Sequence, residues 1–538
     1  MTRKCFQSLS SGALGSLLLA ASLHGQPGGL GKIDFSTSGQ PEAQKHFLRG
    51  ALLLHSFEFD DAAEAFRQAQ KLDPGFAMAY WGEAMTFNHP LWMEQDAAAA
   101  RKVLDRLAPS AEARLAKAPT EREKMYLSAV EELYGKGDKA ANDRAYAEAM
   151  RRLHERFPED EDAAAFYALS LLGTCEGKRD FPTYMKAAAI AEEVFAKNPL
   201  HPGAVHYLIH SYDDPVHAPL GMRAARVYAK IAPAAGHALH MPSHIFFASG
   251  MWDAAAFSNE AAWQASLDRA GRKMLGPDDH NYHALFWLEY AYLQMGRYGE
   301  ARKVLSAMEE DAGKSGSDRA KLHRAMMRAA YLIETRRFDS DVARSLAEEG
   351  ERGVALFAEG FAAAAKGERD RAGKALAAIG KEPAGGHHGG GAMYAMGRVS
   401  GGSADAVMKT ELEALLASLR GEKERALALA KEAAAAEDAM SFEFGPPAVA
   451  KPAHELLGEM LLRSGDAGQA RAEFERSLSR APERALSLLG LARAAAKSGD
   501  RTAAEDTYRR LAAVWRRADP DLPEIAEVRG SAPPVAAR

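Results

Sequence analysis

The chain contains very little cysteine, and this excludes two kinds of site. Only Cys5 and Cys175 occur among its 538 residues. Cys5 lies in an N-terminal segment that we expect to be removed, so Cys175 has no partner for an intramolecular disulfide. A metal site built from several cysteines is excluded for the same reason. In the sequence LLGTCEGKRD, Cys175 has no setting typical of a nucleophile, and we interpret it as a small residue at a helix end.

A strong excess of charge of one sign is also absent. The formal net charge is −5 over the whole chain, which gives no electrostatic basis for binding nucleic acid or an anionic membrane. Long segments lack proline and β-branched runs and are rich in alanine, leucine, glutamate, arginine and lysine, which favours helix. Because 538 residues exceed what one compact core supports, the composition favours an elongated helical solenoid.

No apolar run at the N-terminus is long enough for a transmembrane helix. The segment MTRKCFQSLSSGALGSLLLAASLHG begins with the basic residues Arg3 and Lys4, followed by an apolar run of about a dozen residues and then small residues. This pattern is typical of a secretory signal peptide over residues 1–25, with an uncleaved anchor as the alternative. We therefore expect an exported protein, periplasmic or secreted, with no integral membrane segment in the mature chain.

Familiar catalytic motifs are missing as well. The chain has no H-E-x-x-H, no G-x-S-x-G and no phosphate-binding loop. The sequence therefore favours a protein without enzymatic activity, although the histidines described next leave a metal-dependent hydrolase open.

Histidine is concentrated in one stretch, since residues from His201 to His244 include seven histidines. Two pairs, His206/His210 and His240/His244, have i,i+4 spacing, which places both imidazoles of a pair on one face of a helix. The second pair follows the first by 34 residues, the period of the tetratricopeptide repeat. The two pairs therefore occupy equivalent positions in consecutive repeats.

Small and large residues at fixed offsets indicate the same repeat elsewhere. In the helical hairpin at 42–74, Gly50 takes the small position of the first helix, Phe66 the large position of the second, and Pro74 closes the unit. Gly458 and Phe474 take the same positions near the C-terminus. Units with such matches cover 42–74, 202–265, 282–310 and 451–516. Because one hairpin cannot bury its apolar face, neighbouring units must stack.

These matches make the chain resemble the tetratricopeptide repeat superfamily. The boxes YWGEAMTFNHPLW, HPGAVHYLIHSYDDPVHAP, HALHMPSHIF and FGPPAVAKPAHELLGE resemble, more narrowly, exported bacterial tetratricopeptide proteins of unassigned activity. The resemblance implies an all-α, right-handed superhelical solenoid of antiparallel helix pairs. It also implies that the first helices of the pairs line a concave face, where partner peptides bind.

The predicted organisation follows from these units and from the segments between them. A long glycine-rich segment, PAGGHHGGGAMYAMGRVSGG, separates two predicted arrays, which are either distinct or parts of one continuous solenoid. The parts are a signal peptide at 1–25, an N-terminal array with a histidine-rich groove at 40–310, degenerate helical repeats at 311–382, a glycine-rich loop or linker at 383–402, a C-terminal array at 403–527 and a disordered tail at 528–538.

Two functions are open for the histidine stretch. The resemblance implies that the positions of the four paired histidines face the concave groove. In the first hypothesis, the chain is an exported scaffold that binds a peptide or protein partner there. The groove would be lined by His206, His210, His240, His244, Trp81, Tyr212, Phe246 and Tyr282.

In the second hypothesis, the four paired histidines bind a divalent transition metal such as Zn, Cu or Ni. Adjacent first helices pack about 8 to 10 Å apart, and imidazole is a good ligand for these ions. Additional candidate ligands are His283, Asp213 and Asp279, although an aspartate at a helix end also acts as a plain cap. Metal storage or metal-dependent hydrolysis would follow from such a site, and a purely structural cluster is the third alternative.

A further pair, His55 and His89, is also separated by 34 residues. We expect each at the end of a first helix, where a histidine interacts favourably with the helix dipole. A structural role explains both residues.

Overall fold

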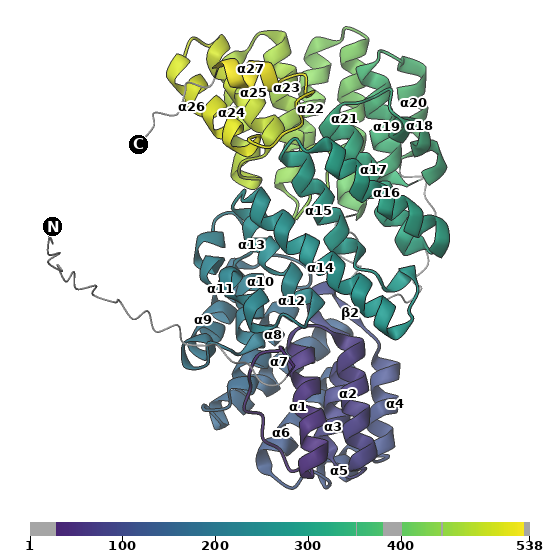
Figure 1. Ribbon diagram of the computed structural model, residues 1–538, viewed down its shortest axis with the longest axis vertical. Helices are drawn as coiled ribbons and strands as arrows, with labels where there is room; N and C mark the ends of the chain where they lie inside the picture. Colours follow the sequence, from purple (N-terminus) through teal and green to yellow (C-terminus); the bar gives the residue numbers. More distant parts are fainter. Residues whose placement is uncertain (1–27, 351, 380–400, 443–444, 532–538) are drawn as a thin grey trace, which may run out of the picture.

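Antiparallel helix pairs follow one another along the whole fold (Figure 1). The computed structural model describes residues 28–350, 352–379, 401–442 and 445–531. The predicted signal peptide at 1–25 and most of the glycine-rich segment at 383–402 lie outside these residues. Within them, strand is limited to β1 (Asn88–His89) and β2 (Glu94–Gln95), an antiparallel pair around the short helix η1 (Pro90–Trp92). The predicted all-α solenoid is confirmed.

Helices α1 to α11 close into a first ring, because α1 packs against α10. The closure is held by hydrogen bonds: Tyr228 donates from its hydroxyl to Ser56 Oγ (3.2 Å), and the His237 backbone N–H donates to Glu58 Oε1 (2.8 Å). The helices of this ring are α1 (Pro41–His55), α2 (Phe59–Leu72), α3 (Ala77–Met85), α4 (Ala97–Leu107), α5 (Ala111–Leu115), α6 (Glu121–Leu133), α7 (Lys139–Arg156), α8 (Glu161–Gly173), α9 (Phe181–Lys197), α10 (Pro202–Tyr212) and α11 (Ala218–Ile231).

The centre of the first ring is filled by aromatic side chains. Trp81 is fully buried, and its ring centroid lies 5.2 Å from that of Tyr126 and 5.5 Å from that of Phe166. Phe35 packs on Trp81 at 5.7 Å. The prediction that Trp81 lines an open concave groove is therefore wrong, because the solenoid curves tightly enough here for its inner side chains to form a core.

An extended N-terminal segment, residues 28–39, reinforces this closure, although no motif in these residues predicts it. The Lys32 backbone N–H donates to Leu200 O (2.9 Å), and Gly29 O accepts from the Ala234 N–H (3.0 Å). Gly31 has a φ of +94°, and a Cβ there would meet Leu200 O at 2.7 Å, so only glycine fits this close approach. The segment thus ties the turns before α10 and after α11 to the start of α1.

The repeat pattern has a direct packing cause. The ring of Phe66 in α2 lies between two first helices, so close that a Cβ on Gly50 would be 2.7 Å from it and one on Gly82 would be 2.3 Å from it. Near the C-terminus the ring of Phe474 would lie 3.0 Å from a Cβ on Gly458. The small position thus allows the large aromatic residue of the second helix to fit between neighbouring first helices.

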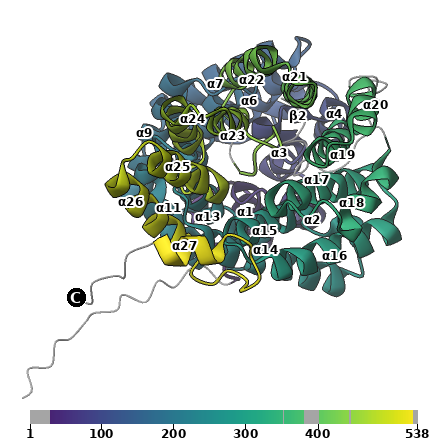
Figure 2. The same cartoon turned by 90° about the horizontal axis from the view of Figure 1, so that it is seen from above.

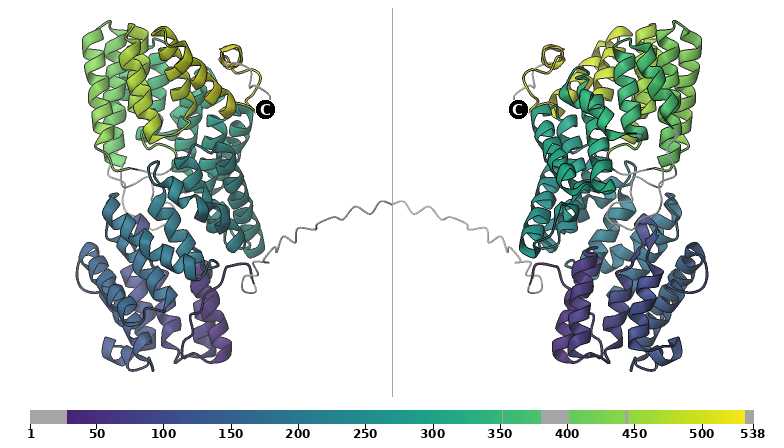
Figure 3. Two further views of the ribbon diagram at one scale, coloured as in Figure 1. Left: turned by 90° about the vertical axis from the view of Figure 1, so that its left-hand side faces the viewer. Right: turned by 90° about the vertical axis from the view of Figure 1, so that its right-hand side faces the viewer.

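Helices α12 to α14 connect the first ring to a second ring, α15 to α26, which follows a circle when seen from above (Figure 2). The bounds in this half are α12 (Gly236–His240), α13 (Pro242–Ala248), α14 (Trp252–Lys273), η2 (Pro277–Asp279), α15 (Tyr282–Gln294), α16 (Tyr298–Ser315), α17 (Asp318–Thr335), α18 (Asp341–Ser345), η3 (Leu346–Glu349), α19 (Gly353–Ala365), α20 (Arg369–Ala378), α21 (Gly401–Leu419), α22 (Lys423–Asp438), α23 (Ala453–Ser464), α24 (Ala467–Arg480), α25 (Ala485–Lys497) and α26 (Arg501–Val514). The two rings are stacked along the long axis of the molecule (Figures 1 and 3).

The second ring closes where α25 and the end of α26 return to α15. The contacts are made by Gln294 at the end of α15. The side-chain oxygen of Gln294 accepts from the Ala485 backbone N–H (3.0 Å), and the backbone carbonyl of Gln294 accepts from Trp515 Nε1 (3.0 Å). The chain then continues to α27 (Ile525–Ser531), where Glu527 pairs with Arg493 (2.6 Å). The disordered tail is predicted to begin at residue 528, but α27 continues to Ser531. Residues 532–538 lie outside the described residues.

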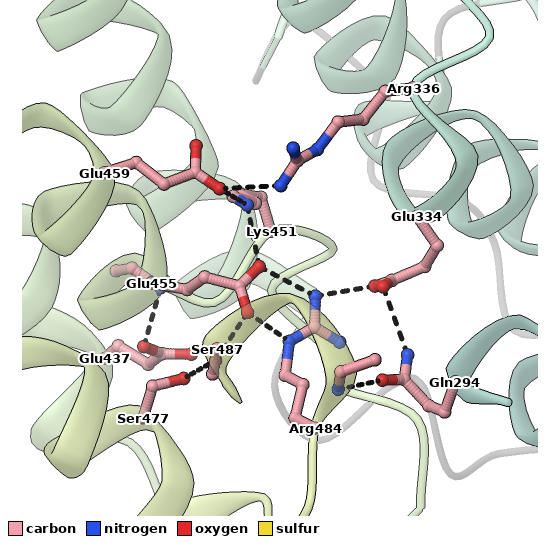
Figure 4. Close-up of polar contacts among 12 residues, drawn as sticks. Gln294, Glu334, Arg336, Glu437, Lys451, Glu455, Glu459, Ser477, Arg484 and Ser487 are labelled. Carbon is pink, nitrogen blue, oxygen red and sulfur yellow. Dashed lines mark hydrogen bonds and ion pairs between the residues drawn. The ribbon is translucent and has the colours of Figure 1, made fainter. Parts of the chain in front are cut away.

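A buried charge network lies inside the second ring (Figure 4). Arg484 is fully buried and donates to both carboxylate oxygens of Glu455 (2.8 and 3.0 Å) and to Glu334 (2.6 Å). Lys451 donates to Glu455 (2.7 Å) and to Glu459 (2.7 Å). These contacts join α17 to α23 and to the turn before α25, so buried charge pairs hold these parts of the second ring together. No described helix combines the length and hydropathy needed to cross a membrane.

Candidate histidine centre

Six buried histidines meet between the two rings. The four predicted residues are joined by His237 from α12 and His283 from α15. All six are at most 8% exposed. They are His206 and His210 on α10, His237 and His240 on α12, His244 on α13 and His283 on α15.

The i,i+4 spacing acts as predicted. His240 Nε2 and His244 Nε2 lie 3.1 Å apart, although α12 ends at His240 and α13 begins at Pro242. Proline has no N–H to donate, but Met241 between them keeps helical angles (φ −53°, ψ −37°), so the two imidazoles still project from one face. On α10, the ring centroids of His206 and His210 are 4.9 Å apart.

The four predicted histidines are divided between two groups rather than forming one site. In each of three groups, the ligand atoms lie within 4.8 Å of one another, close enough to share a metal ion. Two of the groups contain only histidine, and the third joins them through Asp213. The groups are His206/His210/His237, His240/His244/His283 and His210/Asp213/His244.

Polar partners behind the imidazoles orient them. The Nδ1 atoms of three histidines contact acceptors: His206 contacts the His55 carbonyl (2.7 Å), His240 contacts Asn259 Oδ1 (2.6 Å), and His244 contacts Asp213 Oδ2 (2.9 Å). The side chain of Arg179 donates to Asp213 Oδ1 (2.6 Å). Histidines that bind metals are commonly oriented in this way. Sequence reasoning missed Asn259 and Arg179, because a polar residue within a regular helix or loop carries no local signal of what it will face.

Comparisons with known proteins bear on the fold alone. No protein-family model and no curated protein matches the chain. Among solved structures it is similar to yeast Tom70, at 16% identity over 86% of this chain and 96% of that chain, with a TM-score of 0.37. A human IFIT1 dimer with m7Gppp-AAAA is similar at 13% identity over 90% and 92% of the two chains, with a TM-score of 0.35.

The chain has a tetratricopeptide-like fold. This assignment rests on its own antiparallel helix pairs and on two second-helix residues, Phe66 and Phe474, each of which packs against small residues of two first helices.

Burial favours the neutral form of five imidazoles in the centre, those of His206, His237, His240, His244 and His283. Desolvation lowers the pKa of His244 to about 4, although its contact with Asp213 acts in the opposite direction. The same cause holds the pKa of His206, His237, His240 and His283 well below the ordinary value. Burial alone would raise the pKa of Asp213, but Arg179, His210 and His244 together hold it well below its usual range. Neutral imidazole is the form that binds metals.

Three of the remaining predicted site residues belong to the core. Tyr212, Phe246 and Tyr282 are buried, so the prediction that they line an exposed groove is wrong. Asp279 lies in η2, where its carboxylate is 3.9 Å from Arg269 rather than in the histidine groups. Asp213, by contrast, contacts the histidines directly.

A separate buried trio contains His55. Its Nε2 lies 2.9 Å from Asp162 Oδ1, and His201 Nε2 lies 3.5 Å from the same oxygen. Burial lowers the pKa of His55 to about 4 despite Asp162. His89 instead contacts the Thr86 carbonyl (3.0 Å). His55 therefore helps to close the first ring.

The thiol of Cys175 is unreactive at neutral pH. Its partial burial raises the pKa of the thiol to about 11, so the thiol stays protonated.

Proposed function

We propose that the protein is an exported scaffold that binds a protein partner on the inner surface of its second ring. Helical-repeat arrays present extended concave surfaces, and partner binding is their usual role. Because the first ring is filled by its own side chains, the partner is assigned to the second ring. Export is supported by the basic and apolar segments at 1–25.

A hollow between the neighbouring first helices α23 and α25 carries this proposal. Its volume is about 200 Å³. Leucine side chains and charged side chains line it together, so it suits a segment with an apolar anchor and flanking charge. The lining residues include Arg336, Glu459, Leu462, Arg463, Leu486, Leu489 and Arg493.

Arg463 is the cation at this hollow that is best placed to meet a partner. Its side chain is 60% exposed, and its carboxylate neighbour, Glu459, is 4.0 Å away. Arg493 is held more closely by Glu527, at 2.6 Å, and Arg336 by Glu459, at 3.3 Å. The partner segment is therefore expected to place an acidic residue near Arg463, beside an apolar residue over Leu462.

Site-specific photocrosslinking tests the assignment. A photoreactive residue is introduced at Leu462 in the full chain and, as a control, at Arg476 on α24, whose side chain is 63% exposed. A discrete crosslinked partner is expected at 462 and not at 476. Charge reversal at the hollow, Arg463→Glu, should reduce the crosslink at 462 about tenfold, whereas Arg476→Glu should not.

Two results would overturn the proposal. One is equal crosslinking from both positions, and the other is a crosslink at 462 that survives Arg463→Glu unchanged. Export is tested separately by fractionating cells and mapping the N-terminus of the mature protein. A mature chain that begins near residue 26 and lies outside the cytoplasm is expected, and a cytoplasmic chain that keeps Met1 would contradict export.

A further inference from the structure

The pair His240 and His244 holds its protons on the outer nitrogens. His240 Nδ1 lies 2.6 Å from Asn259 Oδ1, and the amide orientation of Asn259 is set because its Nδ2 donates to Ala255 O (2.8 Å). An amide oxygen only accepts, so His240 Nδ1 donates; Ser243 Oγ lies farther away, at 3.4 Å. His244 Nδ1 likewise donates to the carboxylate of Asp213 (2.9 Å).

The inner nitrogens of the two rings therefore carry lone pairs that face each other. His240 Nε2 and His244 Nε2 are 3.1 Å apart. Two neutral imidazoles in these tautomers repel at this distance. A shared proton would remove the repulsion, but it would leave an imidazolium in a site that is fully buried, where desolvation penalises the charged form.

A metal ion removes the repulsion and fits the distance. Two nitrogen ligands, each about 2.0 to 2.1 Å from one tetrahedral zinc ion, lie about 3.3 Å apart. The observed separation of 3.1 Å is close to this value. Coordination bonds to several imidazoles also compensate the cost of burying the ion, as structural zinc sites show.

A third ligand comes from the second ring. His283 on α15 has its ring centroid 4.7 Å from that of His240, and one nitrogen from each of His240, His244 and His283 lies within 4.8 Å of the others. His283 is only 8% exposed, and its Nε2 has no hydrogen-bond partner in the described part of the chain. A buried imidazole nitrogen without a hydrogen-bond partner costs free energy, and coordination of a metal ion by His283 would remove this cost.

The neighbouring group around His206 does not require an ion. His206 Nδ1 donates to the His55 carbonyl (2.7 Å), so its Nε2 is an acceptor. His237 Nε2 lies 3.2 Å from it, and His237 Nδ1 has no acceptor among the described residues. His237 can therefore keep its proton on Nε2 and donate it to His206, which leaves both rings neutral and hydrogen-bonded.

From these contacts we propose that His240, His244 and His283 bind one divalent transition metal ion, and the separation of the two Nε2 atoms is close to that expected for zinc. Asn259 and Asp213 are positioning residues, because they fix the tautomers that aim the two Nε2 atoms at the ion. Two ligands come from the connection between the rings and one from α15. The ion therefore fastens the second ring to the end of the first. This proposal does not depend on the partner assigned to the hollow at α23 and α25.

Zinc binding by the full chain, purified without a histidine tag, tests the proposal. The metal content is measured by mass spectrometry, and the metal-free protein is then titrated with Zn²⁺ against a chromophoric chelator. We expect one equivalent to be lost in His240→Gln and in His283→Gln. The matched control, His237→Gln, should keep it, because His237 lies outside the three ligands. Circular dichroism establishes that each variant is folded.

Wild-type protein that binds no Zn²⁺, or equal binding by wild type and His283→Gln, would overturn the proposal. Loss in His237→Gln as large as that in His283→Gln would also overturn it. If His240→Gln does not fold, X-ray absorption on the zinc-loaded wild type decides. Imidazole nitrogens at about 2.0 to 2.1 Å support the site, and a shell of oxygen ligands alone refutes it.

Discussion

Replacing Arg484 by methionine should remove a buried cation that joins three parts of the second ring. Arg484 joins Glu334 of α17 to Glu455 of α23 in a site where its side chain is fully buried. Methionine keeps an apolar stem of similar length but leaves the carboxylates without this cation. Glu455 keeps Lys451 at 2.7 Å, whereas the Glu334 carboxylate keeps, among the described residues, only the hydrogen bond from the Gln294 amide, at 3.1 Å. Glu334 is therefore the group left with an uncompensated charge.

The expected magnitude follows from that asymmetry. Breaking a buried ion pair by removing one partner costs about 3 to 5 kcal/mol, because the other charge stays buried. Adding Glu334→Gln to Arg484→Met removes the uncompensated charge, so the double variant should lose only about 1 to 2 kcal/mol. The double variant is therefore expected to be more stable than the single variant from which it was made.

Urea unfolding followed by circular dichroism measures the free energy of unfolding of each variant, and hydrogen exchange in peptides from α23 and α25 locates the loss in the second ring. Arg476→Met is the matched control, because the Arg476 side chain is 63% exposed and its replacement should change stability by less than about 0.5 kcal/mol. A loss below about 1 kcal/mol for Arg484→Met, or no recovery in the double variant, would refute the reasoning.

Three other changes test separate contacts. Asn259→Ala removes the acceptor that orients His240 and should weaken Zn²⁺ binding about 10- to 100-fold in chelator competition without unfolding the chain; unchanged affinity would contradict the positioning role. Gly203→Ala places a Cβ 2.3 Å from His55 Nδ1 and should lower the free energy of unfolding by about 1 to 3 kcal/mol, measured by thermal unfolding. An unchanged melting temperature would show that the His55 side chain moves to accommodate the Cβ. Burial raises the pKa of Glu289 well above its ordinary value, so the folded state keeps a proton that the unfolded state has lost, and stability falls as the pH rises from about 4.5 toward neutrality. Glu289→Gln should flatten this decline and raise the free energy of unfolding at pH 7 by about 1.4 kcal/mol for each unit of the pKa shift. Parallel pH profiles of stability for the two proteins would exclude a contribution from Glu289.

The helix pairs could be predicted because their causes are local. Gly50 and Phe66 lie at offsets that bring a small and a large residue together whenever two helices form a hairpin, and the structure shows this contact. The i,i+4 spacing of His240 and His244 likewise survives the proline between them, because a proline in the first turn of a helix needs no N–H. These features depend on neighbours within one or two turns, so one sequence contains them.

The open groove could not be judged from the same offsets. Repeat positions say which side chains face inward but not how tightly successive pairs curve. Curvature is the sum of small rotations at each interface. In the first ring this sum brings α1 onto α10, so Trp81 becomes core rather than groove surface. The extended segment at 28–39, which helps to close that ring, has no periodic pattern that would reveal its partners.

By itself, the sequence determined the all-α repeat fold, the helices that carry the histidines and the face from which each pair projects. Only the tertiary structure decided that His283 joins His240 and His244. It also decided that Asn259 contacts His240 and that Arg179 contacts Asp213. A spacing of 34 residues fixes a position within a repeat. The convergence of three nitrogen atoms depends on the relative rotation of α12, α13 and α15, which is set by packing between distant parts of the chain.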